Sequence, residues 1–302
     1  AVLKEVRTGR RSYGDFAVLY RANAQSRSLE EAFLTMRVPH VLIGGQRFYE
    51  RKEIKDMVSY LRLALNPMDD ASLRRVVNLP ARGIGASALK TFESWANARS
   101  SSLWHALTDT ALTQELAKKS LSGVRSFTSL IEDAAEIARG GLVTPVLKHL
   151  MDRSGYLDEL RTQRDDESVS RLENLQELVN VTTEYDSSTA EPSLSAFLEN
   201  VALIADVDTL NETGEAVTLI TLHSSKGLEF NVVFLIGMEE GVFPHSRSLG
   251  SDTELEEERR LAYVGMTRAR QELHLTHATR RALYGQPSFN RRSRFLDDIP
   301  DN

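Results

Sequence analysis

The chain has 302 residues, enough for two domains, and its apolar fraction of 41% and charged fraction of 26% are those of an ordinary globular protein. Its longest apolar runs fall far below the roughly 20 residues that cross a bilayer, and without cysteine it has neither disulfides nor thiolate metal sites. These features exclude a membrane-spanning protein and favour a reducing cytosol, so we expect a cytoplasmic location with no membrane partner.

The net charge of −6 does not by itself predict a polyanion partner, but two segments are basic. Residues 4–27 carry six basic side chains against two acidic ones, and residues 268–294 carry seven arginines against the single Glu272. A protein that is acidic overall can still hold phosphates along such a basic track.

The first 48 residues have the pattern of an α/β sheet domain. An apolar strand is expected at Phe16–Tyr20, followed by a polar loop and a helix that ends near Arg37. Ser28 and Glu31 have the spacing of a capping box at the start of that helix. A second short strand, Val41–Ile43, ends at a pair of glycines.

The next 160 or so residues read as helices, with apolar side chains recurring at helical spacing. Between the first helices lies the sequence LPARGIGA (residues 79–86), a turn in which two glycines bracket one isoleucine. Asp206–Glu215 is acidic and reads as a linker. Further helices are expected near Ile54–Leu65, Leu73–Val77, Ala88–Ala98, Val124–Arg139, Pro145–Arg153, Ser168–Tyr185 and Leu194–Ala205.

Strand character resumes in Val217–Gly237, where two β-branched apolar runs flank a polar turn, residues 223–229. Unbroken apolar runs are typical of strands buried on both faces of a parallel sheet. The carboxyl ends of such strands are where open α/β sheets bind ligands, so this turn is a candidate site. A simple polar connection between two core strands is the alternative.

The last segment predicts a helix with an acidic start at residues 252–258, and then a strand, Leu273–Thr276. Leu261, Val264 and Tyr263 are expected to face the core, with Arg268 at the end of the helix. For an isolated arginine, interaction with the helix dipole is the simpler interpretation.

The order α/β, helical, α/β indicates a helical domain inserted into one parallel-sheet domain, because Val41–Ile43 lack companion strands until those after Val217 arrive. The expected divisions are 1–49 and 209–302 for the sheet domain and 50–208 for the helical insertion.

Four segments together resemble the carboxyl-terminal half of the UvrD/PcrA/Rep-like superfamily 1 DNA helicases. They are FAVLYRANAQSR (16–27), GGQRFYERKEIKD (44–56), TLHSSKGLEF (221–230) and EERRLAYVGMTRAR (257–270), and the resemblance spans nearly the whole chain. It implies a RecA-like second domain, of the P-loop NTPase type but without its own P-loop, interrupted by the accessory domain called 2B.

The resemblance also implies an ATP site. Gly227 and Glu229 would bind the nucleotide, with Glu229 contacting the ribose, and Arg268 would be the arginine finger at the γ-phosphate. A solvated loop carboxylate is the alternative for Glu229.

For DNA, the resemblance implies that Arg21 and Asn23 contact the single-strand backbone, that His223 and His245 line the same track, and that Tyr284 stacks on a base. The turn Arg82, Gly83, Ile84 and Gly85 resembles a helix-hairpin-helix that approaches duplex phosphates, with Lys90 adding a charge. A glycine helix stop before a new helix is the alternative interpretation.

No G-x-x-x-x-G-K-[ST] motif occurs in the chain, and no acidic magnesium site precedes the helical segment. We therefore expect the ATP phosphates and Mg²⁺ to be held by an amino-terminal half that this chain lacks, and the chain alone not to hydrolyse ATP. The expected partners are that half, single-stranded DNA, single/double-strand junctions and repair proteins. A non-catalytic binding module and the motor part of a helicase-nuclease are the alternatives, and the 3′ to 5′ direction comes from the resemblance alone.

Overall fold

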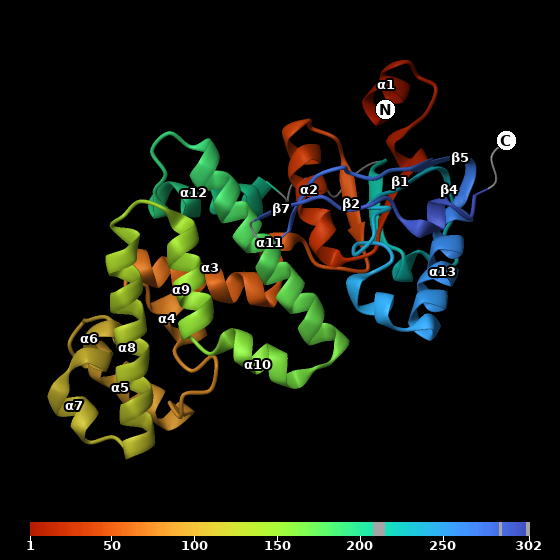
Figure 1. Ribbon diagram of the computed structural model, residues 1–302. Helices are drawn as coiled ribbons and strands as arrows, with labels where there is room; N and C mark the ends of the chain where they lie inside the picture. The colour runs from red at the N-terminus through yellow and green to blue at the C-terminus, as the bar shows by residue number, and fades with distance from the viewer. Residues whose placement is uncertain (208–214, 284–285, 300–302) are drawn as a thin grey trace. The chain divides into compact units, whose positions relative to one another are not determined.

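Residues from both ends of the chain build one five-stranded parallel sheet with the strand order β2-β3-β1-β4-β5 (Figure 1). This computed structural model describes residues 1–207, 215–283 and 286–299. Residues 1–50 and 204–302 form the sheet unit, and residues 51–203 form a helical unit. The α/β class with a helical insertion is therefore confirmed. None of the helices described is long and apolar enough to cross a membrane.

In the sheet unit, helices α1, α2 and α13 cover the two faces of the sheet. Its elements are α1 (Val2–Arg7), β1 (Phe16–Tyr20), α2 (Ser26–Thr35), β2 (His40–Ile43), β3 (Val217–Thr221), β4 (Phe230–Leu235), α13 (Asp252–Met266), β5 (Ala269–Leu275) and the antiparallel pair β6 (Arg281–Leu283) and β7 (Gln286–Ser288). Strand β2 pairs only with β3, as expected for a strand whose companions come late in the sequence.

The central strands bury both of their faces, as their unbroken apolar runs predicted. In β1, Phe16, Val18 and Tyr20 belong to one apolar cluster, while Ala17 and Leu19 belong to the other. Side chains of α1 and α2 pack on the first cluster, and side chains of α13 pack on the second. The sheet is thus the middle of three layers, which fixes its edges as the places where loops can bind ligands.

Two details of the sequence interpretation are wrong. Helix α2 begins at Ser26, so Ser28 lies inside it, and Glu31 accepts a hydrogen bond from Arg27 instead of capping the helix. A 3-10 turn, Asn23–Gln25, runs directly into α2 and leaves no separate helix start at Ser28. Tyr263, expected in the core, is 70% exposed on the outer face of α13.

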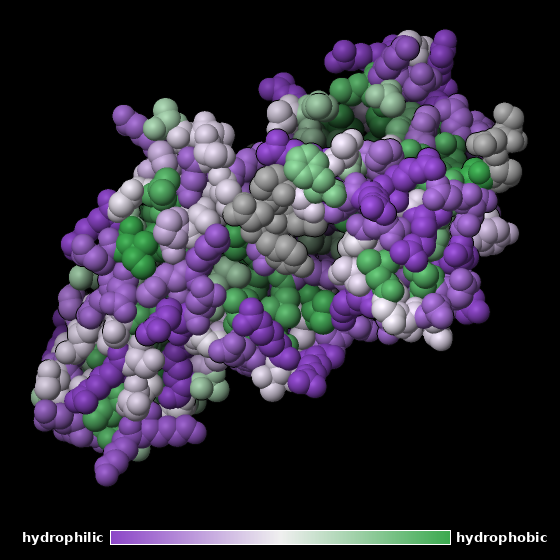
Figure 2. Space-filling model, viewed as in Figure 1, coloured by the Kyte–Doolittle hydropathy of each residue, from purple (hydrophilic) through white to green (hydrophobic). Residues whose placement is uncertain are grey.

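The helical unit packs α3 across α8 and α9 (Figure 1). Polar residues cover most of the visible surface, with smaller apolar patches between them (Figure 2). The helices are α3 (Lys52–Leu65), α4 (Asp70–Val76), α5 (Ala86–Ala98), α6 (Leu103–Thr108), α7 (Thr110–Gln114), α8 (Lys118–Ala138), α9 (Val143–Arg153), α10 (Tyr156–Gln163), α11 (Asp166–Ser188) and α12 (Leu194–Val207), whose end continues into the sheet unit.

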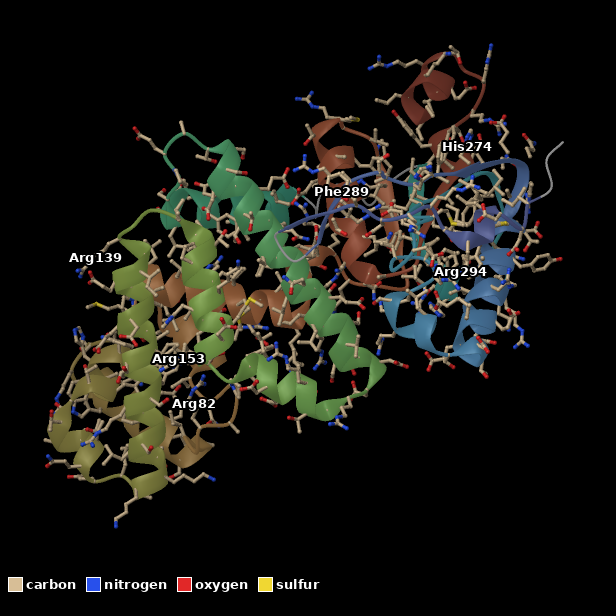
Figure 3. The ribbon with its side chains drawn as sticks, viewed as in Figure 1. Arg82, Arg139, Arg153, His274, Phe289 and Arg294 are labelled. Carbon is tan, nitrogen blue, oxygen red and sulfur yellow. The ribbon has the colours of Figure 1, made fainter. Side chains whose placement is uncertain are left out.

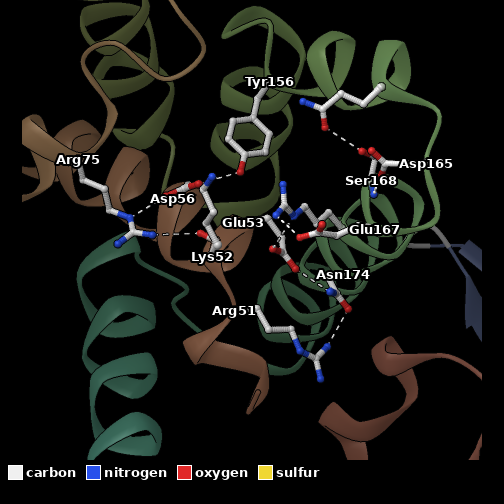
Figure 4. Close-up of polar contacts among 12 residues, drawn as sticks. Arg51, Lys52, Glu53, Asp56, Arg75, Tyr156, Asp165, Glu167, Ser168 and Asn174 are labelled. Carbon is white, nitrogen blue, oxygen red and sulfur yellow. Dashed lines mark hydrogen bonds and ion pairs between the residues drawn. The ribbon is translucent and has the colours of Figure 1, made fainter. Parts of the chain in front are cut away.

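Buried polar side chains tie α3 to its neighbours (Figure 4). The Asp56 carboxylate accepts from Arg75 Nε and from Tyr156 Oη, both at 2.7 Å. Burial, followed by the charge of Asp56, raises the pKa of Tyr156, so the phenol keeps its proton and donates. Asn174 accepts a hydrogen bond from Arg51 and donates one to Glu53. These bonds satisfy groups that would otherwise destabilise the interior.

Candidate functional site

Loops that follow three different strands meet at the carboxyl edge of the sheet. A Cβ atom built on Gly44, after β2, would lie 2.6 Å from Ser224 Oγ, after β3. A Cβ on neighbouring Gly45 would lie 3.7 Å from Asn23 Oδ1, after β1. The structure thus brings Asn23 and the 3-10 turn that holds exposed His223 to one edge, although about 200 residues separate them in the sequence.

Arg21 and His245 share one buried carboxylate, that of Glu258 on α13. Arg21 Nε donates to Glu258 Oε1 at 2.8 Å and to Oε2 at 3.1 Å, and the His245 N–H donates to Oε2 at 3.0 Å. The Arg21 charge is therefore largely compensated inside the protein. Its predicted contact with DNA stays a prediction, to be made by the donors that Glu258 does not use.

Sequence reasoning missed Glu258, although a signal was present. Glu258, Ala262 and Gly265 follow one another at helical spacing, and all three are buried. A carboxylate on the core-facing stripe of a helix indicates a buried cationic partner, because an unpaired buried charge is very costly. The pattern does not say which arginine is that partner.

Arg268 lies just beyond the end of α13 and is held by three internal acceptors. Its Nε donates to the Val264 carbonyl and its Nη1 to the Leu228 carbonyl, both at 3.0 Å, and its Nη2 donates to Thr267 Oγ1 at 3.1 Å. A guanidinium has five N–H donors, so two remain without an acceptor among the described residues. The arginine is fixed in direction and can still bind an anion.

Glu229 stands beside Arg268 and Arg270. Glu229 Oε2 lies 3.1 Å from Arg270 Nε, and both side chains are more than half exposed. The Arg268 carbonyl accepts from the Phe230 N–H at 2.9 Å, which fixes the end of the turn to the start of β5. Gly227, with a φ of +86°, gives the turn a left-handed step that other residues rarely adopt.

The polar turn 223–229 runs from the carboxyl end of β3 back to the amino end of the parallel strand β4. Thr221 pairs with Tyr20, whereas Val232 pairs with Phe16, four steps lower on β1, or about 13 Å at the rise of a strand. His223 therefore lies at the carboxyl ends of the strands, and Glu229 lies toward their amino ends. The sequence interpretation placed the whole turn at the carboxyl edge, and that is correct only for its first part.

The glycine turn of the helical unit, residues 82–85, is stabilised by internal hydrogen bonds of Arg82 and Asn78. Arg82 donates from Nη1 to the carbonyls of Val76, Val77 and Pro80, and from Nη2 to Tyr60 Oη and the Ser154 carbonyl (Figure 3). The N–H groups of Arg82 and Ile84 both donate to Asn78 Oδ1. The Arg82 guanidinium is thus occupied by internal acceptors and Ile84 is 2% exposed, and their predicted contact with duplex DNA stays a prediction.

The contact of Gly83 and Gly85 with a phosphate also stays a prediction. Gly83 has a φ of +77°, and a Cβ atom there would lie 2.7 Å from Lys119 Cγ. Gly85 precedes α5 and has open space beside it, and Lys90 is exposed on α5. Tyr284, the predicted stacking ring, lies outside the described residues.

We expect Gly123→Ala to lower the free energy of unfolding by about 1 to 3 kcal/mol. Gly123 lies in α8, and an added Cβ would overlap the backbone carbonyl of Arg82, so the glycine turn or the helix must move. Thermal and urea unfolding would measure the loss. Ser122→Ala, exposed one residue earlier in the same helix, should stay within about 0.5 kcal/mol of the parent. Equal stabilities for the two variants would contradict this packing.

Glu239 forms a second buried ion pair that sequence reasoning missed. It is fully buried after β4 and accepts from Arg281 Nε at 2.9 Å and Nη2 at 2.7 Å, from the Ala278 N–H at 2.8 Å, and from Asn290 Nδ2 at 3.3 Å. These partners lie on both sides of the β6–β7 hairpin, so one carboxylate fixes both of its ends. Within the ranges that the structure describes, no cluster of three or more His, Asp or Glu could hold a metal ion.

Comparison with known proteins gives one family and several close relatives. Residues 1–280 match the family model of the UvrD-like helicase C-terminal domain. The chain is 45% identical over 301 residues to the ATP-dependent DNA helicase PcrA of Bacillus subtilis. It is 43% identical over 305 residues to the proteins of the same name from Staphylococcus epidermidis and Staphylococcus aureus.

These alignments cover 98 to 100% of this chain but only 41% of each relative. The chain therefore spans about two fifths of the length of these relatives.

Proposed function

Since the chain belongs to the UvrD-like helicase C-terminal domain family, we propose that it forms the carboxyl-terminal half of an ATP-dependent DNA helicase that works in repair or replication. In this proposal it supplies one wall of the ATP site, part of the single-strand track and a domain that contacts duplex DNA. The polypeptide moves 3′ to 5′ on one strand, a direction that rests on family resemblance.

The observation that carries the proposal is the setting of Arg268. Its guanidinium is fixed by three acceptors and keeps two N–H donors, which is what an arginine needs to stabilise charge on a transferred phosphoryl group. The exposed carboxylate of Glu229, the residue after the Leu228 that Arg268 binds, suits a ribose hydroxyl, which donates to carboxylates. Arg268 and Glu229 thus suit a nucleotide that is bound mainly by another part of the protein.

ATP and Mg²⁺ would be held chiefly by the amino-terminal half. The chain has no phosphate-cradling glycine loop followed by lysine, so its own residues could only complete a site. The chemistry supplied by Mg²⁺ in that half would be neutralisation of the phosphate charge. The part of Arg268 is to bind the γ-phosphate as charge develops, and the part of Glu229 is to orient the ribose.

The DNA track would run along the carboxyl edge of the sheet. Asn23 and the turn with His223 meet there, and Arg21 and His245 are joined through Glu258. Four predicted contacts from three distant segments thus belong to one connected region. Polar and cationic groups that hold the backbone without reading bases suit a motor that must ignore sequence.

The polar turn 223–229 gives the proposal a means of coupling. His223 lies at the edge assigned to DNA, and Glu229 lies toward the edge that holds Arg268. Movement of the turn in response to ATP would therefore reach the DNA track, since one short stretch of backbone joins the two sites.

The test is reconstitution of the two halves. We expect the chain alone to show no ATP hydrolysis, and addition of a separately produced amino-terminal half to restore hydrolysis that single-stranded DNA stimulates. Steady-state ATPase assays with and without oligo-dT would measure this. If both halves are folded and associate but no stimulated hydrolysis appears, a non-catalytic binding module becomes the better interpretation.

A further inference from the structure

The β6–β7 hairpin is held at its open end by buried Glu239. The carboxylate binds Ala278 before the hairpin, Arg281 in its first strand and Asn290 after it. Nearby, the Glu240 N–H donates to the Arg291 carbonyl at 2.9 Å, and the Ser293 N–H donates to the Met238 carbonyl at 2.8 Å. Both ends of the hairpin are thus tied to the segment that follows β4.

Side chains at this end of the hairpin fall into two groups, those that reach Glu239 and those that are exposed. Arg281 pairs with Ser288 across the ladder, and Ser288 Oγ donates to Asn290 Oδ1 at 2.8 Å. Arg281 and Asn290 both reach Glu239, so they define the inner face. Arg280 and Phe289, the next residues outward from this last pair, are exposed and take no part in the Glu239 bonds, so they define the outer face.

That outer face presents an aromatic ring to solvent. Phe289 is 74% exposed, the most exposed large apolar side chain among the described residues (Figure 3). Its neighbours Arg280 and Arg291 are also exposed, and neither side chain has an acceptor within the described part of the chain. By contrast, Arg281, Arg292 and Arg294 are each paired with a carboxylate.

We infer that Phe289 and Arg280 form a stacking platform for single-stranded DNA, with the ring under a base and the guanidinium at a neighbouring phosphate. The inference rests on the proposed function and adds a contact to it. A rigidly mounted ring beside uncompensated cations matches the combination of stacking and charge by which proteins hold single strands. An apolar protein partner would not need the two arginines, whereas a polyanion with π-faces needs both features.

The experiment uses the full-length polypeptide that carries this chain and fluorescein-labelled oligo-dT, with anisotropy titrations at several salt concentrations. We expect Phe289→Ala to weaken binding about five- to hundredfold, and Phe289→Tyr to keep most of the affinity, because a phenol ring also stacks. Arg280→Gln should reduce the slope of log affinity against log salt by about 0.7, the value for one phosphate contact on a single strand.

Ile299→Ala is the matched control. Ile299 is an exposed apolar residue of the same unit, 40% exposed, but Asp297 and Asp298 precede it, so it should not contribute to binding. Unchanged affinity of Phe289→Ala in a protein that binds oligo-dT normally would overturn this inference alone. An equal loss in Phe289→Tyr and Phe289→Ala would also overturn it, since stacking would not be the cause. Failure of the parent protein to bind any single strand would overturn the proposed function together with this inference.

Discussion

Arg268→Ala is expected to reduce DNA-stimulated ATP turnover by about three to five orders of magnitude once the chain is joined to its amino-terminal half. The side chain is held by Leu228, Val264 and Thr267 with two donors left over, so its orientation is set before the phosphate arrives. Stabilisation that needs no reorganisation during the reaction is the kind that contributes most to turnover. The kcat for ATP, measured at saturating oligo-dT, would show the loss.

Two further variants separate catalysis from stability. Arg268→Lys keeps the positive charge but lacks the planar fork, so it should recover only a small part of the lost turnover. Arg260→Ala removes a 75% exposed arginine from α13, the helix that precedes Arg268, and should change neither turnover nor thermal stability appreciably. A folded Arg268→Ala enzyme with near-normal kcat would remove Arg268 from the catalytic machinery.

The sheet was largely predictable because its signals are local. Strands β1, β3 and β4 are mostly apolar, and burial on both faces is the physical reason for that pattern. The long helices α3, α8 and α11 were also predicted from a local signal, the helical spacing of their apolar residues. Helices α6, α7 and α10 have five to eight residues, too few turns to show such a period.

The partners within the site were not predictable, because they depend on distant residues. Arg21 meets Glu258 across 237 positions, and Arg82 meets Ser154 across 72. Nothing near Arg21 indicates that a carboxylate will compensate it, and nothing near Arg82 indicates that five acceptors will surround its guanidinium. Motif spacing can place a functional group on an element, but only the packed structure shows which of its donors remain for a ligand.

We expect Glu239→Gln to lower the free energy of unfolding of the sheet unit by about 3 to 5 kcal/mol at pH 7, the usual cost of removing one member of a buried ion pair. Glu240→Gln is the control, because the Glu240–Arg294 pair lies nearer the surface and should be worth about 1 kcal/mol or less. Urea unfolding of both variants and the parent would compare the two pairs.

The same carboxylate predicts a dependence of stability on pH. Burial raises the pKa of Glu239, but hydrogen bonds from Arg281 and Ala278 and the charge of Arg281 outweigh burial, so the folded-state pKa lies below the ordinary value. A carboxylate with a lowered pKa contributes its stability above the unfolded-state pKa of about 4.3, and that contribution disappears as the pH falls through the folded-state pKa. The stability of the parent should therefore fall toward that of Glu239→Gln as the pH drops from 5 toward the folded-state pKa. Parallel stability curves for the two proteins across this range would show that Glu239 is not the charged anchor of the hairpin.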